Sequence, residues 1–299
     1  MTAPLFLCIG DIDVDVLIQV DRLPTRDSKV NGQLLQRVPG GMASNVSVAL
    51  ARLGAPVRIL GRVGDDDEAE FAMAGLGQAG VDTRFVARLV NTRTFSCIAL
   101  LGADGEKSLV KLMTEAYRPS ATDLTIEACA GVTHVHLTSI GDLDLCHRVV
   151  AVARDVGASC SLDVERADAP TDAAELAAAL TGFDLVFCNA ETRQLLDGLI
   201  GSELERLVPT VVTTLGEAGA RVDTAGERVA APGFQAQVLD TTGAGDCFAA
   251  ACLTARLVDH LAWPDALRFA NRAASLSTEG LGPQSALPTR HQEQAALSL

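Results

Sequence analysis

Several common phosphate- and cofactor-binding signatures are missing from this chain of 299 residues. It contains no GxxxxGK[ST] sequence, and its only lysines, Lys29, Lys107 and Lys111, lie outside any phosphate-loop context. This absence excludes a P-loop kinase. Gly10 opens the sequence GDIDVD and not a GxGxxG turn between a strand and a helix, which disfavours a dinucleotide-dependent oxidoreductase.

Positive charge and paired metal ligands are also scarce. The net charge of −14 argues against nucleic acid or an anionic membrane as a partner. The eight cysteines form no CxxC pair, and most lie in apolar runs, which predicts reduced core residues. The apolar run at 4–9 is short, has no basic residues before it and leads into aspartates. We therefore expect no signal peptide and no membrane span, and a cytoplasmic protein.

The pattern of apolar residues predicts an α/β fold. After about residue 120, strands alternate with helices, which is typical of a mostly parallel sheet with helices on both faces. We expect strands at 132–138, 158–163, 183–188 and 209–214, helices at 144–156, 172–181, 190–199, 246–258 and 264–279, and antiparallel structure over 222–239. Strand patterns before residue 120, with an Asp-Gly turn at 103–106, predict a small separate sheet. The prediction is one domain over 1–299, with a β appendage from about 12–38 and 91–116.

The most informative stretch is Asp240-Thr241-Thr242-Gly243-Ala244-Gly245-Asp246, between an extended run at 234–239 and a helical run. Its glycines allow a tight turn, and the following helix begins with unpaired N–H groups that suit a phosphate. Asp246 places a carboxylate there, and its simplest role is to accept a proton from a hydroxyl that attacks a phosphoryl group. We expect the helix N-terminus to keep Asp246 ionised at neutral pH.

A second glycine-rich stretch, Pro39-Gly40-Gly41-Met42-Ala43-Ser44-Asn45, precedes a helical pattern. By itself it indicates a turn with a polar helix cap. The segment continues through Ala-Arg-Leu-Gly to Gly-Arg-Val-Gly-Asp-Asp at 61–66, and Thr-Leu-Gly-Glu-Ala-Gly follows at 214–219. Taken in this order with the stretch ending at Asp246, these motifs cover nearly the full length. The chain resembles the PfkB (ribokinase-like) carbohydrate kinases.

The resemblance implies a ribokinase-like three-layer α/β/α fold with a mostly parallel central sheet and a small β-sheet lid. It implies ATP-dependent phosphorylation of a hydroxymethyl group on a small sugar, which is a pentose, a ketohexose or a sugar acid. The catalytic base would be Asp246, with an anion hole from the amides of Gly243, Ala244 and Gly245. The acceptor would be held by Asp13, Asp15, Gly41 and Asn45. The nucleotide would be lined by Asn189, Thr214, Gly216, Gly219 and Asn271.

The resemblance also implies metal ions. Carbonyls at Asp240 and Thr242 match positions that hold a monovalent cation such as K⁺ in many relatives. Mg²⁺ accompanies ATP, and the family often has Asn-x-x-Glu for it. Here Asn189 is followed by Ala190 and Glu191, so the Glu is one residue early. Either Glu191 acts on Mg²⁺ through water, or the triphosphate holds the ion.

Two departures weaken the case for ribose as the acceptor. Met42 stands where ribose-specific relatives carry a Lys, and Thr138 stands where they carry a Glu. A nucleoside kinase of the same fold is therefore an alternative, and a non-catalytic sugar or nucleotide sensor is another, which the intact Asp246 disfavours. The resemblance further implies a lid that closes over the acceptor and a homodimer through that lid, for which exposed edge strands give a physical reason.

Overall fold

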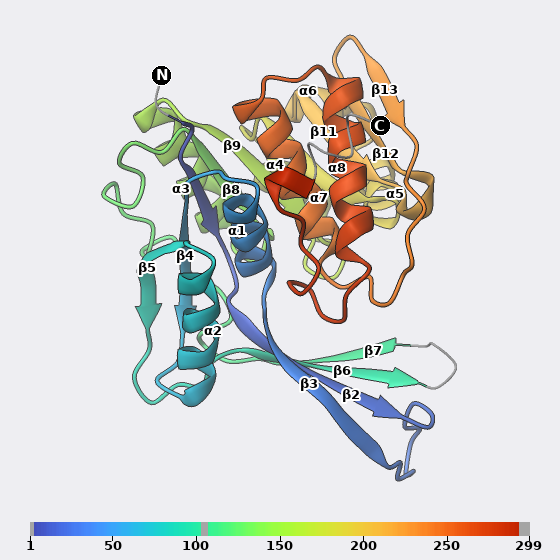
Figure 1. Ribbon diagram of the computed structural model, residues 1–299. Helices are drawn as coiled ribbons and strands as arrows, with labels where there is room; N and C mark the ends of the chain where they lie inside the picture. Colours follow the sequence, from blue (N-terminus) through green and yellow to red (C-terminus); the bar gives the residue numbers. More distant parts are fainter. Residues whose placement is uncertain (1–2, 103–106, 293–299) are drawn as a thin grey trace.

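The computed structural model describes residues 3–102 and 107–292, so the predicted turn at 103–106 lies outside the described residues. Within those ranges, nine strands form a central sheet in the order β13-β12-β11-β10-β9-β8-β1-β4-β5, and four strands form a second sheet in the order β3-β2-β6-β7 (Figure 1). In the central sheet only β12 and β13 are antiparallel to their neighbours.

The strands are β1 (Phe6–Ile9), β2 (Asp13–Val20), β3 (Gly32–Gly40), β4 (Val57–Val63), β5 (Asp82–Arg88), β6 (Ser96–Gly102), β7 (Lys107–Leu112), β8 (His134–Leu137), β9 (Ser159–Val164), β10 (Leu185–Asn189), β11 (Thr210–Thr214), β12 (Ala220–Thr224) and β13 (Arg228–Ala231). The α-helices are α1 (Met42–Arg52), α2 (Asp67–Gln78), α3 (Leu143–Val156), α4 (Ala173–Leu180), α5 (Ala190–Leu199), α6 (Leu204–Leu207), α7 (Ala244–Leu253) and α8 (Trp263–Ser277).

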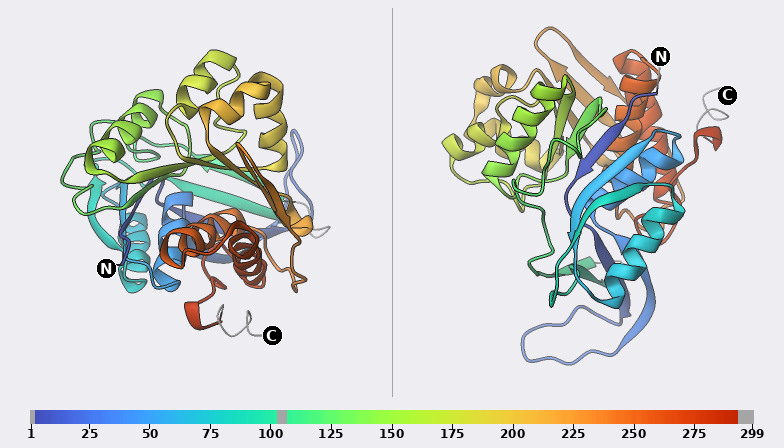
Figure 2. Two further views of the ribbon diagram at one scale, coloured as in Figure 1. Left: turned by 90° about the horizontal axis from the view of Figure 1, so that it is seen from above. Right: turned by 90° about the vertical axis from the view of Figure 1, so that its left-hand side faces the viewer.

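Helices cover both faces of the central sheet, and each face has its own core (Figure 2). Helices α1, α2, α7 and α8 pack on one face, and α3, α4, α5 and α6 contribute to the core on the other. Strand β1 has no exposed residue, because alternate side chains enter the two cores. The predicted three-layer α/β/α fold is confirmed.

The strand order places a binding site at one edge of the sheet. Strand β1 lies between β4 and β8, and connections run away from it in opposite directions. In open parallel sheets such a reversal leaves a crevice at the carboxyl ends of the strands. The chain leaves β1 at this point and enters β2 of the second sheet, so the junction of the two sheets lies over the crevice (Figure 1).

The second sheet projects from the body as a twisted four-stranded ribbon (Figure 1). Its strands lie in the two segments that the sequence assigned to the β appendage. It leaves several large apolar side chains exposed, among them Leu34, Leu109, Leu112 and Met113.

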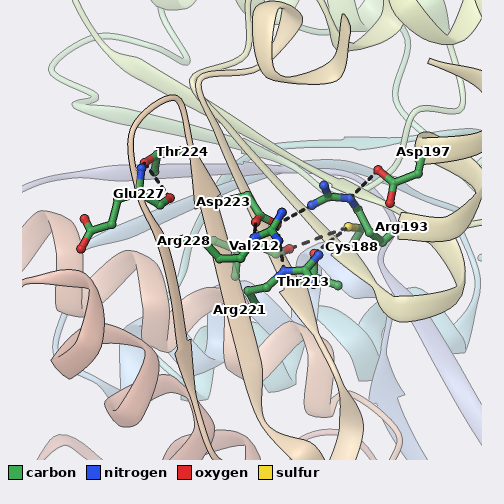
Figure 3. Close-up of polar contacts among 10 residues, drawn as sticks. All are labelled: Cys188, Arg193, Asp197, Val212, Thr213, Arg221, Asp223, Thr224, Glu227 and Arg228. Carbon is green, nitrogen blue, oxygen red and sulfur yellow. Dashed lines mark hydrogen bonds and ion pairs between the residues drawn. The ribbon is translucent and has the colours of Figure 1, made fainter. Parts of the chain in front are cut away.

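A cluster of arginines around one buried aspartate stabilises the antiparallel edge of the central sheet (Figure 3). The carboxylate of Asp223 on β12 accepts from Arg193 of α5 at 2.6 Å, from Arg221 at 2.9 Å and from Arg228 of β13 at 2.5 Å. Burial alone would raise the pKa of Asp223, but these guanidinium groups more than offset it and lower the pKa. The cluster therefore ties α5 to β12 and β13.

The structure differs from the predicted elements in several places. Strand β5 and the short helix α6 have no counterpart among the predicted elements. The antiparallel structure ends at Ala231, so the extended run at 234–239 is not a strand. The helix expected at 246–258 begins at Ala244, and its end at 254–258 is π-helical. Within the described residues, no helix is long and apolar enough to span a bilayer.

Candidate active site

A cavity of about 250 Å³ lies between the carboxyl ends of the sheet strands, the loop before α7 and the inner face of the second sheet. Of the site residues predicted from the sequence, the lining contains Asp13, Asp15, Gly41, Asn45, Asn189, Thr214, Thr242, Gly243, Gly245 and Asp246. The two glycine-rich stretches, 200 residues apart in the sequence, therefore meet in one site.

Asp246 lies in the first turn of α7 and is 7% exposed. Its carboxylate accepts a hydrogen bond from Asn45 Nδ2 at 2.8 Å, which joins α7 to α1. The amide oxygen of Asn45 in turn accepts from Gln284 Nε2 at 2.9 Å. Gln284 thus holds the amide in the orientation that donates to Asp246. The sequence offered no signal for this role of Gln284.

The surroundings of Asp246 raise its pKa. Burial raises the pKa of Asp246 well above its usual value, and the hydrogen bond from Asn45 lowers it only in part. The negative charges of Asp163, Asp11 and Glu165 add to the increase. Desolvation and neighbouring carboxylates therefore oppose the effect of the helix N-terminus, which was expected to keep Asp246 ionised at neutral pH. A raised pKa makes the ionised form a stronger base.

The loop before α7 presents backbone amides to the cavity. Gly243 has φ 76°, ψ 0° and is the N-cap of α7, a conformation that favours glycine. A Cβ there would also lie 2.7 Å from Pro283. Among the described residues, the amides of Gly243, Gly245 and Asp246 have no hydrogen-bond acceptor, whereas the Ala244 amide donates to Thr241 O at 3.3 Å. The backbone amides of Gly243, Gly245 and Asp246 are therefore free to bind an anion, whereas the amide of Ala244 is not.

Two carboxylates on the second sheet line another part of the cavity. Asp13 and Asp15 are on the same face of β2, beside Gly40 of β3, and are 4% and 8% exposed. A Cβ on Gly40 would lie 2.4 Å from Asp13 Oδ1 and 2.3 Å from Asp15 Oδ2, so glycine leaves the space that the carboxylates fill. Asp13 Oδ1 is buried and, within the described ranges, has no hydrogen-bond partner.

Burial and mutual repulsion raise the pKa values in this part of the cavity. Burial, followed by the charges of Asp15, Asp11 and Asp246, raises the pKa of Asp13 well above its usual value. Burial raises the pKa of Asp11 and of Asp15 to about 6 each. Burying ionised carboxylates costs free energy, and groups that donate hydrogen bonds to them would lower that cost. This part of the cavity is therefore suited to hydroxyl donors.

Gly41 sets the direction of α1 at the cavity. It is the N-cap of α1 with φ 94°, and a Cβ there would lie 2.6 Å from Asp11 O. This close approach directs α1 so that Asn45, one turn into the helix, reaches Asp246.

The predicted nucleotide-binding residues divide into two groups. Asn189 and Thr214 line the cavity at the ends of β10 and β11, and Asn189 also caps α5 by accepting from Thr192 N at 2.8 Å. Gly216, Gly219 and Asn271 lie outside the lining. Gly219 packs against Ala231, and the Asn271 amide donates to the carbonyls of Ala231 and Pro232 at 3.0 Å each. They order the segments beside Thr214.

The side chains of the three predicted metal residues have other partners. Glu191 is largely exposed and pairs with Arg166 Nε at 3.2 Å, outside the cavity lining. The side chain of Asp240 accepts from Thr242 and Gly282 N, and Lys107 contacts both Asp240 and Thr242. In the described part of the chain, no three His, Cys, Asp or Glu side chains are grouped so as to hold a metal ion.

Asp163, Glu165 and Lys111 line the cavity but were not among the predicted site residues. The two acidic residues flank the end of β9, and burial raises the pKa of Asp163 to about 7. Their place at the carboxyl end of a parallel strand was the available signal. Lys111, on β7, donates to Tyr117 Oη at 3.2 Å and comes from the second sheet.

The fold and the cavity together define a class of protein. Free backbone amides and carboxylates line one cavity of an α/β fold, and phosphoryl transfer to a hydroxyl requires both kinds of group. Residues 3–290 match the pfkB family of carbohydrate kinases, and the chain belongs to this family. It is therefore a sugar kinase, that is, a phosphotransferase.

Individual relatives agree with this family. The chain is 33% identical to an ATP-dependent ribose-1-phosphate kinase of Halopiger xanaduensis, with 98% of this chain and 97% of the relative covered. It is 31% identical to a ribokinase of Bacillus subtilis, with 97% and 98% covered. The solved structure of Arabidopsis thaliana ribokinase complexed with ribose and ATP superposes with a TM-score of 0.86 at 27% identity, with 100% of both chains covered.

Proposed function

We propose that this kinase transfers the γ-phosphoryl group of ATP to a hydroxymethyl group of a small sugar. The observation that carries the proposal is the place of Asp246, which lines the same cavity as the α7 loop and the carboxylates of Asp13 and Asp15 and is held there by Asn45. The Arabidopsis ribokinase that shares this fold was solved with ribose and ATP, which supports ATP and a small sugar as the pair of substrates here.

Asp246 is the general base of the proposed reaction. The acceptor hydroxyl donates to its carboxylate and loses its proton as the oxygen attacks phosphorus. Asn45, held by Gln284, orients the carboxylate toward the acceptor. The amides of Gly243, Gly245 and Asp246 bind the phosphoryl oxygens as charge develops on them.

Asp13 and Asp15 orient the acceptor by accepting from its other hydroxyl groups. The unpartnered Asp13 Oδ1 supports this role, because a bound hydroxyl would satisfy it. Thr214 and Asn189 line the donor side, with Gly216, Gly219 and Asn271 ordering the segments around it.

Mg²⁺ bound with the triphosphate would offset phosphate charge. Carboxylate oxygens are the ligands it prefers, and those of Asp163 and Glu165 line the cavity, so the residues fit the ion. Glu191 is the less favoured contact, since it pairs with Arg166 outside the lining.

The small sheet acts as a lid in this proposal. It supplies Asp13, Asp15 and Lys111 to the cavity, so its position determines how well water is excluded from the acceptor. Its exposed leucines support a homodimer through the same sheet. Light scattering at micromolar concentration should give the mass of a dimer, and a single monomeric peak would contradict the proposal.

A second candidate acceptor is a pentose that already carries a phosphate, as in the Halopiger relative. Met42 and Thr138 are uncharged and line a small cavity that also contains Arg118. Arg118 Nη2 and Lys111 Nζ both donate to Tyr117 Oη, so two cations converge beside Met42. The aspartates of the main cavity favour the unphosphorylated sugar.

A nucleoside is a further alternative acceptor, because Met42 and Phe95 give a nucleoside base an apolar surface.

The test is ADP release with ATP, Mg²⁺ and a panel of pentoses, ketohexoses, sugar acids, pentose 1-phosphates and nucleosides. We expect turnover with an unphosphorylated sugar to exceed that with the other classes, and ³¹P NMR to show a phosphate on its hydroxymethyl group. Preference for a pentose 1-phosphate or a nucleoside would select that alternative. Tight ATP binding without turnover of any acceptor would contradict the kinase proposal and favour a sensor.

A further inference from the structure

A lysine from the small sheet contacts the loop that precedes the free amides. Lys107 is the first residue of β7, and its ammonium lies 3.3 Å from Asp240 Oδ1 and within hydrogen-bonding distance of Thr242 Oγ1. These contacts join residues 133 and 135 positions apart in the sequence. The Lys107 side chain is 27% exposed and that of Asp240 is 6% exposed, so the pair is largely removed from solvent.

Asp240 is an unusual neighbour for a phosphate site, because it is a buried anion. Its carboxylate accepts from Thr242 N at 3.0 Å, from Thr242 Oγ1 at 2.6 Å and from Gly282 N at 3.0 Å. Burial alone would raise the pKa of Asp240, but these hydrogen bonds and the Lys107 charge more than offset it and lower the pKa. The group is thus ionised, and its charge would repel phosphate unless a cation balances it.

The position of Lys107 bears on the monovalent cation expected at Asp240 and Thr242. The expected ligands are the carbonyl oxygens of these residues, whereas Lys107 contacts their side-chain oxygens. The ammonium nevertheless places a positive charge beside the same two residues, and this charge repels a second cation there. An ammonium group and K⁺ carry the same charge, and both bind oxygen atoms. The difference is that Lys107 is covalently part of the chain.

We propose that Lys107 takes the place of a monovalent cation at this loop, so that ATP binding and phosphoryl transfer do not depend on K⁺. Lys107 is a positioning residue: it acts on phosphate through Asp240 and Thr242, which hold the backbone at Gly243. The expected effect on turnover rests on the proposed function, whereas ATP affinity alone tests whether Lys107 balances the charge of Asp240.

The chain offers a matched control. Lys29 also belongs to the small-sheet segments, is exposed and, among the described residues, forms no ion pair. Lys29→Met removes the same charge from the same part of the molecule without touching the loop. Lys107→Arg keeps the charge at the loop, and Lys107→Met removes it with little change in length.

The experiment measures ATP affinity by calorimetry, and then turnover with the preferred acceptor, in KCl and in tetramethylammonium chloride at equal ionic strength and fixed Mg²⁺. We expect the wild type and Lys29→Met to change less than about twofold between the salts. Lys107→Met should lose about 10²-fold in turnover in tetramethylammonium, comparable with loss of one oxyanion-stabilising donor. Lys107→Met should also bind ATP more weakly in tetramethylammonium chloride, and its turnover should recover at least about tenfold in KCl. The turnover and ATP affinity of Lys107→Arg should not depend on the salt.

Two results would overturn the inference. One is a wild type whose ATP affinity and turnover rise tenfold or more with K⁺. The other is a folded Lys107→Met variant, checked by circular dichroism, that matches Lys29→Met in both salts. If the wild type binds ATP but phosphorylates no acceptor, the proposed function fails, while the affinities in the two salts still decide the role of Lys107.

Discussion

Two buried aspartates of this protein have opposite surroundings. Asp223 is 5% exposed and is held by three arginines, which lower its pKa. Asp13 is 4% exposed, and its Oδ1 has no partner among the described residues, so burial and neighbouring carboxylates raise its pKa. A buried charge is costly unless it is paired. The paired aspartate therefore stabilises the fold, and the unpaired one is the group that binds the acceptor in the proposed function.

The same contrast separates two regions of the molecule. The arginine cluster lies at the β12–β13 edge of the sheet, where its groups satisfy one another (Figure 3). The cavity holds the carboxylates of Asp11, Asp13, Asp15, Asp163, Glu165 and Asp246, with Lys111 as the one cation in its described lining. The first region should govern stability, and the second should govern activity at some cost to stability.

The largest effect should follow from Asp246→Asn. Loss of the general base should lower kcat by about 10²–10⁴-fold. The free energy of unfolding should stay equal or rise, because an amide replaces a carboxylate whose ionisation burial disfavours. Steady-state ADP release and urea unfolding on one preparation measure both quantities. Activity within twofold of the wild type would remove Asp246 from the mechanism.

Asp223→Asn tests the structural half of the contrast. It leaves Arg193, which is 11% exposed, without its buried partner, and we expect unfolding to become easier by roughly 3–5 kcal/mol. Turnover per folded molecule should be unchanged. Asp197→Asn is the matched control, since Asp197 pairs with the same arginine but is 51% exposed, and it should cost less than about 1 kcal/mol. Equal losses for the two variants would show that burial of Asp223 is not the source of its stabilisation.

The pocket carboxylates predict an unusual pH dependence of stability. Asp11 and Asp15, with pKa about 6, and Asp163, with pKa about 7, bind protons more tightly in the folded protein than in the unfolded chain. Their contribution is therefore present at low pH and is lost as the pH rises from about 4 through about 7. Because one pKa unit corresponds to about 1.4 kcal/mol, we expect the unfolding free energy to fall by several kcal/mol over this range, in urea titrations without ligand.

Asp223 acts in the opposite direction, because its lowered pKa gives stability that is lost as the pH falls below about 4. The control for the pocket is the double variant Asp11→Asn/Asp15→Asn, whose profile should be flatter above pH 4. A wild-type stability that stays constant or rises between pH 4 and 7 would contradict the assignment.

A smaller effect should follow from Gly40→Ala. The new Cβ would fall within 2.4 Å of carboxylate oxygens on Asp13 and Asp15, so both side chains must move. Because they bind the acceptor, its KM should rise by about tenfold, which corresponds to about 1.4 kcal/mol, whereas the KM for ATP should not change. Gly77→Ala is a control, since a Cβ there meets nothing within 4 Å. Equal KM values for both variants would place the acceptor elsewhere.

The sequence predicted the fold class and most elements because the relevant signals are local. Alternating apolar patterns predicted the strands from β8 to β11, and the glycine-rich turns predicted the starts of α1 and α7 to within two residues. Strand β5 was missed because its residues are mostly half-exposed and carry no apolar run. The strand predicted over 234–239 was wrong because this segment is held through Leu239 N and Asp240 N, which both donate to Thr278 O.

Within the site, the sequence identified residues carried by motifs but not those brought there by tertiary packing. Asn45 and Asp246 belong to recognisable stretches, and they meet at 2.8 Å. Gln284 and Lys107 have no motif, and they reach the site from the C-terminal loop and the small sheet. The raised pKa of Asp246 could not be predicted from the sequence, because it depends on burial and on carboxylates from other strands, which the helix N-terminus alone does not reveal.

The most direct test of the contrast compares Asp13→Asn with Asp223→Asn by measuring unfolding free energy and acceptor turnover on the same samples. We expect Asp13→Asn to unfold less readily than the wild type, by on the order of 1 kcal/mol, and to lose acceptor affinity. Asp223→Asn should unfold more readily and keep its turnover. If Asp13→Asn proved less stable and fully active, the unpaired carboxylates would be structural, and the account of the acceptor site would be wrong.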